Sequence, residues 1–164
     1  MSCYSRRNTL SLLAAPFLSA CGFTPLYGPD GAARDIQGLV TIPTLPSRFG
    51  FDLREGLITR LGDPAQADFA LSLQPALSQE GRGIQGDNTI TRFNVEATVD
   101  FAVSRIGAEQ PLFQDRARAF TAYSAVAGPF ATRAAEDDAL RRLADTLADQ
   151  IALRLSATAG AWAQ

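Results

Sequence analysis

The chain has 164 residues, with 15 Lys+Arg, 17 Asp+Glu and a formal net charge of −2 at pH 7. Every basic residue is arginine and histidine is absent, which excludes a Ser-His-Asp triad, a histidine general base and the usual zinc sites. The acidic balance argues against nucleic-acid binding. We therefore expect no enzyme, no catalytic residue, no metal and no cofactor.

Residues 1–20 are typical of a lipoprotein signal peptide that is cleaved. Arg6 and Arg7 form a positive start, and residues 10–20 (LSLLAAPFLSA) form an apolar run of 11 residues. A bilayer-spanning helix needs about 20 apolar residues, so this length favours a signal peptide. The run ends in Leu-Ser-Ala-Cys, the lipobox pattern in which the thiol of Cys21 accepts a diacylglyceryl group. Export by the general or the twin-arginine route stays open.

The alternative is a plain signal peptide that happens to contain a cysteine. The other cysteine, Cys3, lies within the signal, so the mature chain would keep one thiol and could form no internal disulfide. A free thiol is unusual in an exported protein. Acylation of Cys21 removes this difficulty, and it is the interpretation that we adopt.

The residues after the signal divide into a tether and one domain. Residues 21–38 contain several prolines and glycines and show no period, which indicates a lipidated N-terminus and an extended tether. Residues 39–164 form a single predicted domain, whose first strand is residues 39–43. Ser47 is the predicted N-cap of a helix, and Gly62 and Pro64 end it. The apolar stripe of this helix consists of Leu53, Leu57, Ile58 and Leu61.

Three strands and a long helix follow. Residues 67–79 alternate as a strand with one buried face, and Pro75 within it indicates an edge position or a bulge. Residues 80–88 contain three glycines and predict a long hairpin loop. Further strands are predicted at residues 89–104 and 112–126, joined by a turn at residues 106–111. The last helix spans residues 132–159, with an apolar stripe of Leu140, Leu143, Leu147, Ile151 and Leu155.

This order predicts an α+β two-layer sandwich, in which two helices pack on one face of a four-stranded mixed sheet (β-α-β-β-β-α). The outward faces of the second and third strands carry serine, glutamine, asparagine, threonine and single acids. Such a surface either faces solvent or contacts a polar partner. The lumen of an outer-membrane β-barrel is a partner of that kind.

The chain resembles the LPS-assembly lipoprotein family, LptE, over nearly all of its mature sequence. Its opening, Cys-Gly-Phe-Thr-Pro-Leu-Tyr at residues 21–27, is similar to the opening of many members. The resemblance continues in the long strand around residues 91–95 (TRFNV). It ends with residues 123–124 (YS), residues 129–131 (PFA) and the helix that contains residues 135–139 (AEDDA).

The resemblance implies a role as a plug inside a large outer-membrane β-barrel, the lipopolysaccharide translocon. Members help that barrel to fold and help to deliver lipopolysaccharide to the outer leaflet. The implied partners are the barrel, lipopolysaccharide and the membrane, which is reached through the lipid anchor. The implied location is the periplasmic side of the outer membrane. Gly22 agrees with it, because an aspartate after the lipidated cysteine is the common signal for inner-membrane retention.

Lipopolysaccharide carries phosphates and carboxylates, which favour the bidentate fork of arginine. Our candidate ligands are Arg82 in the glycine-rich hairpin and Arg92 at the start of the next strand. Arg116 and Arg118 are second choices. The alternative is that all four are ordinary solvated or salt-bridged side chains.

The sequence leaves two other classes of protein as alternatives. One is an accessory lipoprotein of another envelope lipid-transport or secretion complex, which would lack a barrel partner. The other is a lipid-anchored hydrolase. No Gly-x-Ser-x-Gly motif is present, and no pair of acids stands out for glycoside cleavage.

Overall fold

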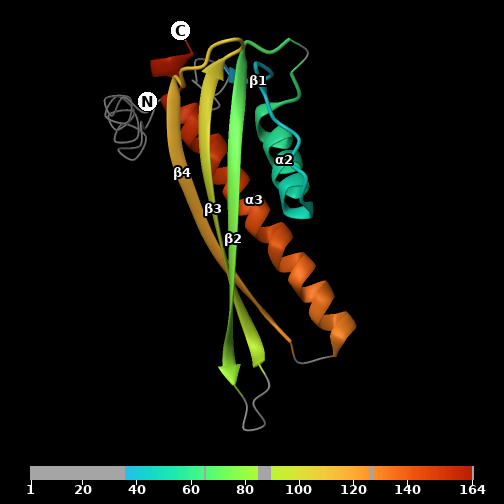
Figure 1. Ribbon diagram of the computed structural model, residues 1–164. Coiled ribbons are helices and arrows are strands. Elements are labelled where there is room, and N and C mark those ends of the chain that lie inside the picture. The colour runs from blue at the N-terminus through green and yellow to red at the C-terminus, as the bar shows by residue number, and fades with distance from the viewer. Residues whose placement is uncertain (1–35, 65, 85–89, 126–127, 164) are drawn as a thin grey trace, which may run out of the picture.

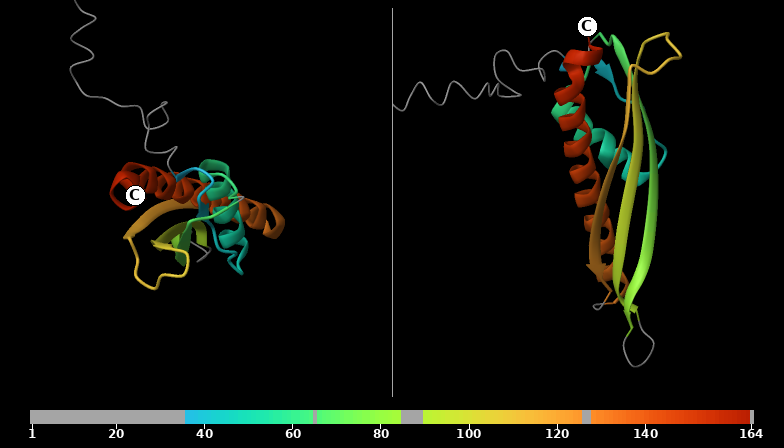
Figure 2. Two further views of the ribbon diagram at one scale, coloured as in Figure 1. Left: turned by 90° about the horizontal axis from the view of Figure 1, so that it is seen from above. Right: turned by 90° about the vertical axis from the view of Figure 1, so that its left-hand side faces the viewer.

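The computed structural model describes residues 36–64, 66–84, 90–125 and 128–163. Its elements are β1 (Val40–Thr41), α2 (Arg48–Leu61), β2 (Phe69–Ile84), β3 (Ile90–Arg105), β4 (Phe113–Ser124) and α3 (Pro129–Trp162). The strands form one sheet in the order β1-β2-β3-β4, with β1 parallel to β2 and the other pairs antiparallel. Both helices cover the same face of this sheet (Figures 1 and 2). The predicted fold class is confirmed.

The molecule is elongated and has two distinct ends (Figure 1). The tether end holds β1, the β3–β4 turn and the C-terminus of α3. Ile36, the first described residue, lies next to β1, because its carbonyl accepts a hydrogen bond from the N–H of Leu39. The hairpin end holds the far ends of β2 and β3 and the start of α3. None of the helices in the described ranges is long and apolar enough to cross a membrane.

Helix α2 begins and ends at the residues that the sequence predicts. The Oγ of Ser47 accepts a hydrogen bond of 2.9 Å from the N–H of Gly50, which satisfies one free donor of the first turn. Gly62 has a φ of 83°, and its N–H donates to the carbonyl of Ile58. A positive φ is easily adopted by glycine alone, so this residue ends the helix.

Helix α3 begins at Pro129, earlier than the predicted start at Thr132. Proline is favoured in the first turn, because its missing N–H has no partner there and its φ already suits a helix. Gly128, with a φ of 92°, precedes it and turns the chain out of the sheet. The sequence interpretation was wrong here because it treated the proline as a terminator of the strand and not as the first residue of the helix.

Strand β2 is longer than predicted, and the predicted loop at residues 80–88 is correspondingly wrong over residues 80–84. The antiparallel ladder with β3 continues through Glu80↔Asn94 and Arg82↔Arg92 to Ile84↔Ile90. Glycines within this stretch lower β propensity. The long partner strand supplies ladder hydrogen bonds that outweigh this preference. Residues 85–89 lie outside the described part of the chain.

The core lies between the sheet and the two helices. Every second residue of β2, β3 and β4 faces inward, and α3 buries Leu143, Leu147, Ile151 and Leu155 against them. The helices approach closely where they cross: a Cβ built on Gly56 would lie 2.9 Å from the Cβ of Ala148. At the tether end, Ile36 is fully buried, so the compact body includes residue 36 of the predicted tether.

Trp162 closes the core at the tether end. Its ring meets that of Phe69 edge-on, with centroids 5.2 Å apart, and its Nε1 donates a 3.0 Å hydrogen bond to Thr158. The face of the sheet that carries the helices is less completely covered toward the hairpin end, because α2 lies against the half of the sheet nearer the tether end (Figure 1). Leu77, predicted to be buried with its strand neighbours, is accordingly 47% exposed.

Candidate functional site

The candidate site is the face of the sheet that carries no helix, which we call the outer face. It is formed by the even-numbered residues of β2, β3 and β4, since successive side chains of a strand point to opposite sides. Strand register aligns these residues into rows of three. From the tether end the rows are Ser72–Ala102–Gln114, Gln74–Asp100–Arg116, Ala76–Thr98–Arg118, Ser78–Glu96–Phe120, Glu80–Asn94–Ala122 and Arg82–Arg92–Ser124.

The outer face gathers all four arginines that the sequence analysis proposed. Its acidic residues within the strands number three, namely Glu80, Glu96 and Asp100. The face therefore carries a small positive excess, although the whole chain is acidic. This local excess is the reverse of the overall charge, and it favours an anionic ligand on this face.

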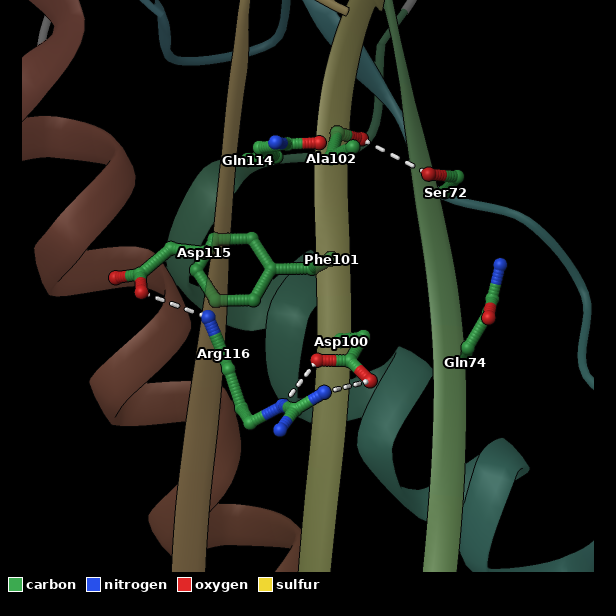
Figure 3. Close-up of a pocket in the computed structure, with 8 residues that line it drawn as sticks. All are labelled: Ser72, Gln74, Asp100, Phe101, Ala102, Gln114, Asp115 and Arg116. Carbon is green, nitrogen blue, oxygen red and sulfur yellow. Dashed lines mark hydrogen bonds and ion pairs between the residues drawn. The ribbon is translucent and has the colours of Figure 1, made fainter.

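The tether-end part of the outer face holds a depression of about 560 Å³ (Figure 3). Arg116 crosses it toward Asp100, its direct neighbour on β3, with N–O distances of 2.5 and 3.0 Å. These hydrogen bonds hold the pKa of Asp100 below its ordinary value. Ser72, Gln74, Gln114 and Asp115 line the same polar depression. Asp115 pairs with Arg154 of α3, so both acids of this depression have an arginine partner.

Arg118 is also paired. It reaches diagonally to Glu96, with an Nε–Oε1 distance of 2.6 Å, and the hydrogen bond lowers the pKa of that carboxyl. Both second-choice arginines are therefore held by an acid of the neighbouring strand. A ligand phosphate would have to replace an existing bidentate or charge-assisted partner at either position.

Arg82 and Arg92 differ from the other two. They are Cα partners across β2 and β3, so two like charges stand directly opposite each other. Arg82 pairs with Glu80 of its own strand at 2.9 Å. Arg92 forms no ion pair or side-chain hydrogen bond with another residue in the described part of the chain. Like-charge pairing leaves excess positive charge at the hairpin end of the outer face.

A second depression, of about 570 Å³, lies at these two arginines. Phe120 also lines it and is 87% exposed, although it lies in the middle of a regular strand. Phe120 is not among the site residues predicted from the sequence. The sequence could have indicated it, because alternation along a strand places residue 120 on the same face as Arg116 and Arg118. The site thus combines a bare aromatic ring with guanidinium groups.

Tyr123 supports this region from the inner face. Its ring stacks on Phe93 with centroids 5.1 Å apart, and its Oη accepts a 2.6 Å hydrogen bond from Nε2 of Gln79. Burial raises the pKa of this phenol. Three strands are therefore tied together directly beneath the hairpin-end depression, which fixes the spacing of the outer-face side chains.

Two further predictions concern chemistry outside this face. Cys21 lies outside the described residues, so its predicted acylation stays a prediction. Among the described residues, histidine, cysteine, aspartate and glutamate form no group of three that could hold a metal ion. The acidic run at residues 136–138 of α3 contributes an ion pair between Asp138 and Arg142.

Comparison with known proteins gives a consistent set of relatives. The family model LptE, described as lipopolysaccharide-assembly, matches residues 34–155. A lipoprotein from Caulobacter crescentus CB15 is similar in structure, with a TM-score of 0.64 and 24% identity, over 79% of this chain and 98% of that one. The rare lipoprotein B from Shewanella oneidensis gives a TM-score of 0.52 and 19% identity, over 73% and 93% of the two chains.

A minor lipoprotein from Acinetobacter baumannii gives a TM-score of 0.55 and 17% identity, over 73% of this chain and 89% of that one. No curated protein sequence matches the chain. At these identities the solved structures establish a shared fold, and the family model matches the sequence itself over residues 34–155.

Proposed function

The chain belongs to the LptE family of lipopolysaccharide-assembly proteins, and from this we propose that it plugs the barrel of the lipopolysaccharide translocon. In this proposal Cys21 anchors it to the periplasmic leaflet of the outer membrane. The protein helps the barrel to assemble and helps to pass lipopolysaccharide to the outer leaflet. It acts by binding and not by bond cleavage, which agrees with a family of assembly proteins.

The observation that carries the proposal is the outer face. Three long strands present a polar surface that no helix of the described chain covers. The interior of an outer-membrane barrel is polar, so such a face suits contact with its wall. Six aligned rows of side chains give this surface a fixed register, and the paired arginines within it have their partners already in place.

Within this face the hairpin-end depression is the proposed contact for lipopolysaccharide. Arg82 and Arg92 supply hydrogen-bond donors for a phosphate. A phosphate that binds Arg92 replaces no ion pair with another described residue. Phe120 offers an apolar ring beside them. An amphiphile with phosphate beside apolar groups has both parts of this pattern. Arg116 and Arg118 are proposed instead to hold the sheet surface together, through Asp100 and Glu96.

Removing both arginines of this like-charged pair should weaken lipopolysaccharide binding. For the mature protein carrying Arg82→Ala and Arg92→Ala, we expect an affinity about tenfold lower, or roughly 1.4 kcal/mol. Arg48→Ala is the matched control, since Arg48 is an exposed arginine on the helix side of the molecule. Titration with labelled lipopolysaccharide measures both. Unchanged binding by the double variant eliminates the two arginines as ligands.

Depletion of the protein tests the function as a whole. We expect the amount of folded translocon barrel to fall, and surface lipopolysaccharide to fall with it. Both are scored in the same cells, the first by heat-modifiable mobility of the barrel and the second by surface labelling. If surface lipopolysaccharide falls while barrel assembly stays normal, the proposed role in barrel assembly is contradicted. Normal values of both would contradict the proposal.

A further inference from the structure

One aromatic ring stands among polar side chains in the hairpin-end depression. Phe120 is 87% exposed and lines this depression of about 570 Å³. Among the described outer-face side chains that line it, Ala122 is the other apolar one. The remaining ones are polar or charged: Ser78, Glu80, Arg82, Arg92, Asn94 and Glu96. The depression therefore offers one flat apolar surface with polar groups beside it.

Strand register separates the ring from the arginines. The row that holds Arg82 and Arg92 lies four residues farther toward the hairpin end than the row of Phe120. At about 3.3 Å per residue, the two rows are roughly 13 Å apart. The row between them, which we call the middle row, consists of Glu80, Asn94 and Ala122. A ligand that touches both the ring and a guanidinium group must cross this middle row.

The middle row does not suit an acyl chain. Glu80 and Asn94 are exposed, and a chain that lay across them would separate both from water. Covering a polar group without giving it a hydrogen-bond partner costs free energy, and covering a charge costs more. A hydroxyl group, in contrast, can donate to the carboxylate and can either donate to or accept from the amide. The middle row therefore favours a part of a ligand that carries several hydroxyls.

The ring of Phe120 suits the same kind of ligand. The face of an aromatic ring carries partial negative charge, and the C–H groups on one side of a pyranose carry partial positive charge. A sugar can therefore lie flat on the ring while its hydroxyls reach polar side chains. The Arg118–Glu96 ion pair stands beside Phe120 on β4 and β3, whereas Ala122 has only a methyl group. Space beside the ring is thus left on the side of the middle row.

We propose that the hairpin-end depression holds the phosphorylated sugar part of lipopolysaccharide and not its acyl chains. A sugar ring lies on Phe120, and its hydroxyls bind Asn94 and Glu80. A phosphate on the sugar reaches Arg82 and Arg92, whose guanidinium groups bind it bidentately. This inference rests on the proposed contact of the depression with lipopolysaccharide, and it assigns to Phe120 the selection of the part of that ligand that is held.

The test replaces Phe120 in the mature protein with leucine and with tryptophan. Leucine keeps an apolar side chain without a flat face, and tryptophan keeps the face. Phe130→Leu is the matched control, because Phe130 is 93% exposed and lies in the first turn of α3, outside this depression. Two competitors are titrated against labelled lipopolysaccharide. One is lipopolysaccharide stripped of its acyl chains, and the other is dodecyl phosphate below its critical micelle concentration, which has a phosphate and a chain but no sugar.

We expect the stripped lipopolysaccharide to compete, with an affinity about tenfold lower for Phe120→Leu and within about twofold of the unaltered protein for Phe120→Trp and Phe130→Leu. Unchanged affinity of Phe120→Leu, or an equal loss in the leucine and tryptophan variants, overturns the stacked sugar. Competition by dodecyl phosphate and none by the stripped lipopolysaccharide overturns it as well. If the unaltered protein binds no labelled lipopolysaccharide at all, the proposed function is contradicted instead, so the two failures are distinguishable.

Discussion

Replacing Cys21 with serine is expected to remove the protein from the outer-membrane fraction and to leave the signal peptide uncleaved by the lipoprotein peptidase. The reason is that the hydroxyl cannot form the thioether to the diacylglyceryl group. Each buried methylene of an acyl chain contributes about 0.8 kcal/mol to membrane binding, so loss of the chains removes most of the attachment. Fractionation, together with mass spectrometry of the N-terminal peptide, measures the effect.

Cys3→Ser is the matched control for this variant. Cys3 lies in the predicted signal peptide and is discarded with it, so we expect normal acylation and normal membrane attachment. A Cys21→Ser protein that is found in the outer membrane at the level of the unaltered protein would show that another feature holds it there. An unmodified thiol on Cys21 of the natural protein would contradict the predicted lipobox.

Leu147→Ala should lower the free energy of unfolding by about 2–5 kcal/mol, which is the range for truncating a buried leucine. Leu147 lies midway along α3 and is fully buried between the helix and the sheet. The substitution removes its apolar contacts and leaves a cavity. Because the domain is of a size that usually unfolds in one step, urea denaturation followed by circular dichroism measures the change.

Leu153→Ala, on the same helix, is the control. The side chain of Leu153 is 55% exposed, so its truncation is expected to change the free energy of unfolding by less than about 0.5 kcal/mol. Helix propensity is nearly equal in the two variants, since both replace leucine with alanine. Equal effects of the two substitutions would contradict the assignment of the inward face of α3.

Much of this fold follows from periodicity in the sequence. In β3, apolar and polar residues alternate over residues 93–104 with one exception, Ala102, and the structure buries residues of the predicted apolar face, including Val95, Val99 and Val103. The predicted cap at Ser47 is also confirmed. In both cases the deciding interactions are local or repeat with a fixed period, so they are visible without knowing what the chain packs against.

The sequence-based predictions were wrong where contacts with segments distant in the sequence decide the local structure or the burial of a side chain. Residues 80–84 contain glycines and predict a loop, but pairing with β3 extends them as strand. Leu77 belongs to the apolar face of its strand, yet α2 covers the other half of the sheet and leaves it exposed. No local pattern indicates how far a helix reaches along a strand to which it is connected by a loop.

In the candidate site, too, local patterns predict some features and distant partners decide others. Alternation places Arg116 and Arg118 on one face, and the structure confirms that placement. Their ion pairs with Asp100 and Glu96 depend on strand register, which the sequence alone did not fix. That register separates these paired arginines from Arg92, and it places Phe120 beside the hairpin-end depression. The sequence found the charged groups, and the structure distinguishes them by their partners.

The central proposal is that the outer face docks against an outer-membrane barrel, and crosslinking from Phe120 tests it most directly. Phe120 is replaced in living cells by a photoreactive phenylalanine analogue, and the adducts formed on irradiation are identified by mass spectrometry. The same cells without irradiation are the control. The account predicts a covalent adduct with a large outer-membrane β-barrel. Adducts with subunits of another envelope machine, and none with a barrel, would contradict it.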